Sequence, residues 1–147
     1  MSSPELENLA RVGKLKPESG AQSEIDGLVQ SGRARLTDAG KRALNIESRF
    51  DLAYNAAHAL SLAALRWRGY RSENRYIVFQ ILPHTLGLGV DVWRVLARAH
   101  DLRNSSEYEG HLEPPASLPQ RECTPDRGGM LSVWTIPCFS CVTHQTV

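Results

Sequence analysis

The residues best suited to chemistry lie close together, between Asp91 and Gly110. Four polar side chains recur there at i, i+3, i+4 and i+7, and this spacing places them on one face of a helix: His100, Arg103, Asn104 and Glu107. Tyr108 follows one position further round. An imidazole transfers protons near neutral pH, and a guanidinium binds carboxylates and phosphates. The spacing therefore predicts that this helix face holds the functional site of the protein.

One reaction that these residue types suit is cleavage of RNA by attack of a 2′-hydroxyl group. It needs a base, an acid and a cation to stabilise the charged phosphorane. Arg103 would supply the cation, His100 the base or the acid, and Asn104 would orient one of them. The alternative interpretation is a solvated or helix-packing face, on which Arg103 pairs with Glu107 one turn further on.

Helices must position this face. The stretch Asp91–Gly110 carries its own apolar stripe of Val92, Val95, Leu96, Ala99 and Leu102. The most regular helical pattern runs from Ile46 to Arg68, with Gly69 suited to the position after its end. Its apolar stripe includes Phe50, Ala53, Ala57, Leu60, Ala64 and Trp67. His58 lies within this helix, where a hydrogen-bonded core residue is a commoner outcome than a ligand.

The rest of the first 110 residues is also mainly helical. Ser2 and Pro4 favour a short helix that ends near Gly13, and Ser23 is a suitable N-cap for a second one. A turn is expected from Lys14 to Gly20. Tyr76–Leu82 has the composition of a strand but stands between helices, and periodicity does not decide a run this short.

Arginines and aromatic residues alternate from Arg66 to Tyr76. Arginines bind phosphates and aromatic rings stack on unpaired bases, so Arg66, Arg68 and Arg71 are candidate contacts for single-stranded RNA or a nucleotide. The alternative interpretation is that these cations stabilise a helix end beside a polar loop.

Beyond Gly110 the helical pattern ends. Leu112–Val147 contains five of the eight prolines and all three cysteines, which predicts an irregular, partly disordered tail after a bundle of residues 1–111. Cys138, Cys141 and His144, with Cys123 upstream, have zinc-ligand chemistry. They do not form two ligand pairs, so we predict neither a metal site nor a cofactor.

Composition limits the class of protein. The length of 147 residues fits one domain with a real core, and a formal net charge of +1 requires no polyanionic partner, so any basic surface must be local. No apolar run approaches the roughly 20 residues that span a bilayer, and the N-terminus does not resemble a secretory signal. An odd number of cysteines fits a reducing cytoplasm.

Three segments together resemble small bacterial members of the HEPN superfamily, the higher eukaryotes and prokaryotes nucleotide-binding domains. They are RFDLAYNAAHALSLAALRWRGYRS, ILPHTLGLG and HDLRNSSEYEG. The most specific part is Arg103-Asn104 followed by Glu107-Tyr108-x-Gly110. The resemblance covers roughly Leu6–Gly110 and implies an all-α, up-and-down bundle of four or five helices. It also favours a helix for Tyr76–Leu82.

The resemblance implies a site between helices, often at a homodimer interface. Many members bind RNA or nucleotides, or act as ribonuclease toxins, beside a nucleotidyltransferase or an antitoxin in toxin–antitoxin or phage-defence systems. On this basis Arg103, Asn104, Glu107 and Tyr108 are the predicted binding residues. Active ribonucleases of the family have Arg, four to six residues, then His. Here Tyr108 stands after four residues, and His111 comes after seven.

Three hypotheses follow from this departure. The first is an RNA- or nucleotide-binding module whose nuclease activity is weak or absent. The second is a metal-independent ribonuclease that uses Arg103 with His100, a histidine outside the family order. The third is a structural module that dimerises or binds a partner without a ligand. Related domains also continue into a closing helix, so the tail of this chain looks like a replaced terminus.

Overall fold

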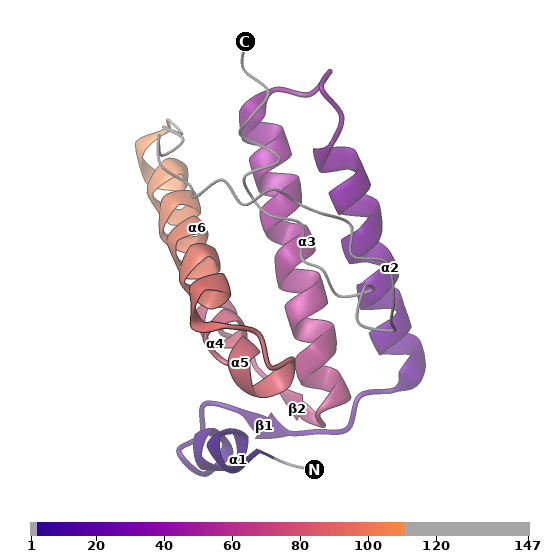
Figure 1. The fold of residues 1–147 in the computed structure, drawn as a ribbon, viewed down its shortest axis with the longest axis vertical. Helices are drawn as coiled ribbons and strands as arrows, with labels where there is room; N and C mark the ends of the chain where they lie inside the picture. The colour runs from indigo at the N-terminus through magenta and orange to yellow at the C-terminus, as the bar shows by residue number, and fades with distance from the viewer. Residues whose placement is uncertain (1–2, 111–147) are drawn as a thin grey trace.

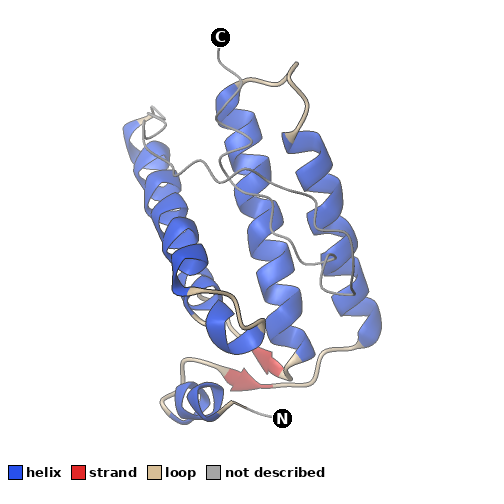
Figure 2. Cartoon of the chain, viewed as in Figure 1, coloured by secondary structure: helices blue, strands red, loops and turns tan. Residues whose placement is uncertain are grey.

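The computed structural model describes residues 3–110, and it confirms the predicted all-α bundle (Figures 1 and 2). Its long helices are α2 (Gln22–Ala39), α3 (Ile46–Trp67) and α6 (Val90–Glu109). Its short helices are α1 (Pro4–Arg11), α4 (Arg75–Gln80) and α5 (Leu82–Thr85). Two short strands, β1 (Lys16–Pro17) and β2 (Tyr70–Arg71), pair antiparallel. The predicted tail of residues 112–147, with its cysteines, lies outside the described residues.

α3 is the central helix, with α2 on one side and α6 on the other (Figure 1). α2 and α3 run antiparallel and pack closely because small residues line their contact. A Cβ atom on Gly32 would lie 2.8 Å from Leu60 Cγ and 3.3 Å from the carbonyl oxygen of Ala56. The glycine in α2 therefore permits this approach, although glycine weakens an isolated helix by about 1 kcal/mol relative to alanine.

Two apolar clusters hold the bundle together. One joins the first half of α3 to α4, α5 and α6, and its buried members include Phe50, Tyr54, Phe79, Leu82 and Leu96. The other lies at the end where α1 and the strands close the bundle, and its buried members include Leu6, Leu15, Leu65, Tyr70 and Ile81. α4 contributes to both clusters, so its position is fixed from two sides.

The run Tyr76–Leu82, whose composition suits a strand, is helical: Tyr76 to Gln80 lie in α4, and Leu82 begins α5. The N-cap of α4 is Asn74, whose side-chain oxygen accepts hydrogen bonds from the backbone nitrogens of Tyr76 (3.0 Å) and Ile77 (3.3 Å). Ile77, Val78 and Phe79 are all buried, because the two apolar clusters lie on different sides of this short helix. The cap and this burial outweigh the strand preference of the β-branched residues.

α6 matches the helix expected over Asp91–Gly110. Leu96 and Ala99 are buried, and Val92, Val95 and Leu102 pack against the same cluster. Gly110 ends the helix with φ 69°, a left-handed conformation that glycine adopts without strain. Neither α6 nor any other helix within residues 3–110 is long and apolar enough to cross a bilayer.

Local predictions differ from the structure at three places. Trp67 is 67% exposed rather than part of the core, because the neighbouring Arg66 takes the inward position at the end of α3. α2 starts at Gln22, and no side chain caps it, so Ser23 is not its N-cap. The expected turn over Lys14–Gly20 contains β1, whose Lys16 and Pro17 pair with Arg71 and Tyr70.

Candidate functional site

The candidate site is a polar network in which α3, α4 and α6 meet. At its centre the hydroxyl of Tyr54 lies 2.7 Å from Nδ1 of His100, and the two rings stack with centroids 6.1 Å apart. Tyr54 is fully buried, whereas His100 is half-buried. The imidazole from α6 is therefore anchored in the core by a side chain of α3.

Both ring nitrogens of His100 are engaged. The amide nitrogen of Asn104, one turn further along α6, lies 3.1 Å from Nε2. An amide nitrogen only donates, so Nε2 accepts, Nδ1 carries the proton, and Nδ1 donates to the oxygen of Tyr54. Turning the amide over would exchange these roles and still leave neither nitrogen free. The imidazole is thus held in one orientation from two sides.

Arg103 lies beside this pair but is neutralised by two carboxylates. Its Nε lies 3.2 Å from Asp51 on α3, and one of its terminal nitrogens lies 2.9 Å from Glu107 on α6. The guanidinium carbon lies 5.2 Å from the ring centroid of Tyr54, within cation–π range. The predicted contact between Arg103 and Glu107 is present, and a contact to α3 accompanies it.

A second guanidinium, that of Arg75 on α4, reaches the same tyrosine. Its carbon lies 5.8 Å from the ring centroid of Tyr54, and one of its nitrogens donates to the amide oxygen of Asn55 at 3.2 Å. The amide nitrogen of Asn55 in turn donates to Asp51. Arg75 is half-buried, and no carboxylate within residues 3–110 pairs with it. Its charge is therefore available to an incoming anion.

His58 lies one turn beyond Tyr54 on α3, with its ring 6.0 Å from that of Phe79. Burial first, and then the nearby charges of Arg75, His100 and Arg35, lower the pKa of His58 to about 4. His58 is half-buried, and no hydrogen bond of its ring is found within residues 3–110. It is neutral at pH 7.

The structure brings only part of the predicted set together. His100, Arg103, Asn104 and Glu107 lie in the network, as their spacing indicated. Tyr108 lies on the same helix with 92% of its surface exposed.

The predicted arginines at the end of α3 are not part of the network. Arg66 lies 12 residues beyond Tyr54 on α3, about 18 Å along the helix axis, and Arg68 and Arg71 follow it. The nitrogens of Arg68 donate to the carbonyl oxygen of Thr85, which ties the end of α3 to α5. Arg71 is exposed and lies 3.4 Å from Glu18.

The contacts of Arg66 hold parts of the fold together. Arg66 is 4% exposed, and its three guanidinium nitrogens bind Glu24 and both the carbonyl and the carboxylate of Glu18. The hydrogen bond from Arg66 lowers the pKa of Glu24 below its usual value. These contacts fasten the start of α2 and the preceding loop to the end of α3.

Arg75 on α4 belongs to the Arg66–Tyr76 stretch expected to contact RNA, but it is not among the candidates named there. Sequence reasoning missed the residues that α3 contributes: Asp51, Tyr54 and Asn55. A pattern that could have found them is present. Asp51, Tyr54, Asn55 and His58 repeat the i, i+3, i+4, i+7 spacing of the polar face of α6. Two helices with the same polar spacing, each within an apolar pattern, are expected to face one another.

Within residues 3–110, no group of three or more histidine, cysteine, aspartate or glutamate side chains is arranged to hold a metal ion. Besides the two carboxylates that hold Arg103, the network offers the cation of Arg75, two amides and an imidazole, which suit an anionic ligand. Comparisons of the chain with protein-family models, with curated proteins and with solved structures found no match.

Proposed function

We propose that this protein is an RNA- or nucleotide-binding module of the HEPN type, and that the network around Tyr54 and His100 receives a phosphate group of the ligand. The observation that carries the proposal is Arg75, a half-buried guanidinium without a carboxylate partner in the described chain. Taking a guanidinium out of water without a counter-ion is unfavourable, and a bound phosphate would supply that counter-ion.

The surroundings of Arg75 fit the same ligand. Tyr76, the next residue on α4, is 37% exposed, and its ring centroid lies 6.1 Å from that of His100. An exposed aromatic ring beside a phosphate site offers a base a surface on which to stack. His58 is neutral at pH 7, so Arg75 and not this imidazole supplies the positive charge.

Ribonuclease activity is less well supported than binding. A general base needs a free nitrogen directed at the 2′-hydroxyl, and both nitrogens of His100 are already bonded. Arg103 would also have to leave Asp51 or Glu107 to contact the phosphorane with its full charge. Binding by Arg75 needs neither change.

The purely structural alternative is supported by the ion pairs of Arg103, which are of the kind that joins helices. It leaves the unpaired charge of Arg75 without a role. A homodimer and a nucleotidyltransferase or antitoxin partner remain predictions from the resemblance, and a cytoplasmic location remains a prediction from the cysteine usage. Size determination in solution tests the dimer.

The test is to measure binding and cleavage of a single-stranded RNA, and binding of ATP, by wild-type protein and by Arg103→Ala. The variant should bind more weakly, because Asp51 and Glu107 would then repel a phosphate without the cation between them. Arg98→Ala is the matched control, since Arg98 is exposed on the same helix and forms no ion pair within residues 3–110. Unchanged affinity in Arg103→Ala favours the structural alternative, and RNA cleavage lost in both Arg103→Ala and His100→Ala favours the ribonuclease.

A further inference from the structure

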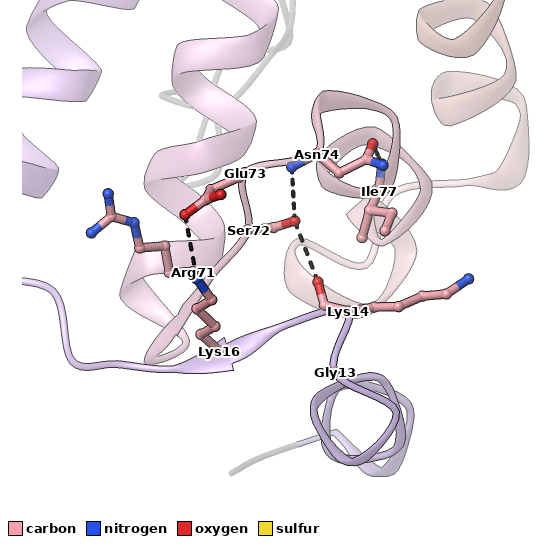
Figure 3. Close-up of a pocket in the computed structure, with 8 residues that line it drawn as sticks. All are labelled: Gly13, Lys14, Lys16, Arg71, Ser72, Glu73, Asn74 and Ile77. Atoms are coloured by element: carbon pink, nitrogen blue, oxygen red, sulfur yellow. Dashed lines mark hydrogen bonds and ion pairs between the residues drawn. The ribbon is translucent and has the colours of Figure 1, made fainter.

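A pocket of about 390 Å³ lies where the β1–β2 pair meets the start of α4 (Figure 3). Its lining combines cationic and polar side chains from segments far apart in sequence. The residues that matter here are Lys14, Lys16, Arg71, Glu73, Asn74 and Ile77. The pairing of Lys16 with Arg71 in the two strands brings these segments side by side.

The charges in this lining are predominantly positive, with three cations and one carboxylate. Lys16 pairs with Glu73 at 3.3 Å and Arg71 pairs with Glu18 at 3.4 Å, but the side chains of both pairs are exposed. Lys14 forms no ion pair within the described residues. Exposed pairs of this kind contribute about 0–1 kcal/mol, so a polyanion can displace them at little cost.

The cations form a row rather than a ring. In Figure 3 the side chains of Arg71 and Lys14 extend to opposite sides, and Lys16 lies between them beside Glu73. A single phosphate ion would contact only part of this row. An extended chain of phosphates fits it better, because each cation meets a separate charge.

α4 connects the row to the candidate site. Asn74 and Ile77 line the pocket, whereas the side chains of Arg75 and Tyr76 reach Tyr54 and His100. The two regions are therefore separated by the width of one helix, about 10 Å. Stacked nucleotides advance about 3.4 Å each, so about three nucleotides cover this distance.

We propose that the cationic row of Lys14, Lys16 and Arg71 binds the backbone phosphates of the RNA strand whose other phosphate lies at Arg75. The strand passes over the first turn of α4 beside Tyr76. This inference rests on the proposed function and extends it, because it makes single-stranded RNA of several nucleotides the ligand, rather than a mononucleotide.

The experiment compares the affinity of a 12-nucleotide single-stranded RNA and of ATP for wild-type protein and for the variant Lys14→Ala/Lys16→Ala/Arg71→Ala. We expect the variant to bind the RNA about tenfold more weakly at 50 mM salt and to bind ATP as the wild type does. The slope of log K against log salt should decrease by about 2, since each phosphate contact on a single strand contributes about 0.7.

A matched control removes the same charge elsewhere. Arg33 is exposed in the later half of α2, and Lys41 and Arg42 are exposed in the loop after it. This loop lies at the other end of α2 and α3 from the strands (Figure 1). The control Arg33→Ala/Lys41→Ala/Arg42→Ala should retain RNA affinity. An equal loss in this control would mean that net charge alone sets the affinity, and it would overturn the inference.

Other outcomes separate the inference from the proposed function. If the pocket variant binds RNA as the wild type does while Arg75→Gln binds it more weakly, the cationic row does not bind RNA, and the Arg75 site of the proposed function stands. A parallel loss of ATP affinity in the pocket variant also overturns the inference, because the pocket would then bind the nucleotide itself. If the wild type binds neither RNA nor ATP, the proposed function fails and the inference fails with it.

Discussion

The hydroxyl of the fully buried Tyr54 lies 2.7 Å from Nδ1 of the half-buried His100. One end of this contact belongs to the apolar core and the other to the face that offers polar groups to a ligand. The guanidinium groups of Arg75 and Arg103 lie 5.8 and 5.2 Å from the same tyrosine ring. The geometry of the network therefore depends on the packing of α3 against α4 and α6.

Removal of this hydroxyl should affect both stability and the site. We expect Tyr54→Phe to lower the free energy of unfolding by about 1 kcal/mol and to change the NMR resonances of the His100 imidazole. Tyr70→Phe is the control, since Tyr70 is buried and no hydrogen bond to its hydroxyl is found within residues 3–110. Equal stability losses in the two variants, with unchanged resonances of His100, would contradict this role.

His58 should make the stability of the protein depend on pH. Its pKa of about 4 in the folded protein lies below the usual value of 6.5, so the unfolded chain binds the proton first as pH falls. Stability is therefore lost between about pH 6.5 and pH 4, by at most about 3 kcal/mol. Urea unfolding at a series of pH values measures this, and we expect the free energy of unfolding of His58→Gln to fall less than that of the wild type over this range. Parallel curves for the two proteins would argue against a buried neutral imidazole.

Two glycines of α2 should respond in opposite ways to the same substitution. A Cβ on Gly27 meets no atom within 4 Å, so Gly27→Ala should stabilise the protein by up to about 1 kcal/mol through helix propensity. A Cβ on Gly32 would press on Leu60 and on the backbone of α3, so Gly32→Ala should destabilise by about 1–2 kcal/mol. Thermal unfolding measures both, and a gain in both variants would mean that α2 and α3 are packed less closely.

Arg66 is expected to stabilise the fold by its ion pairs. Arg66→Gln should lower the free energy of unfolding at pH 7 by about 2 kcal/mol, because Glu18 and Glu24 lose their common partner. Arg66 lowers the pKa of Glu24, so the part of this contribution that comes from Glu24 is present above pH 4.5 and is lost as pH falls through the lower value of the folded state. The difference between wild type and variant should therefore shrink in acid. A variant as stable as Arg98→Gln would exclude this role.

Much of the fold was predictable because α3 and α6 have long apolar stripes with regular spacing. α4 was not predictable from its own pattern, since six residues are too few for periodicity, and the burial that makes it helical comes from residues distant in sequence. Only the family resemblance favours a helix there. Trp67 shows the limit of a stripe: its spacing fits the core, but the ion pairs of Arg66 fix which side of the helix end faces inward.

Only the part of the candidate site that α6 provides was predicted from the sequence. The spacing of His100, Arg103 and Asn104 located the face of α6, and the contact of Arg103 with Glu107 followed from it. The polar spacing of α3 indicates a face for Asp51 that matches the face of α6. The contribution of Arg75 depends on where the short α4 packs, and no local pattern indicates that position.

RNA binding by Arg75→Gln over a range of salt concentrations tests whether Arg75 receives a phosphate. We expect about tenfold weaker binding of a single-stranded RNA at low salt and a slope of log K against log salt that is smaller by about 0.7. Arg98→Gln removes the same charge from an exposed position on α6 and should bind as the wild type does. Equal affinities and equal slopes for wild type, Arg75→Gln and Arg98→Gln would contradict this role of Arg75.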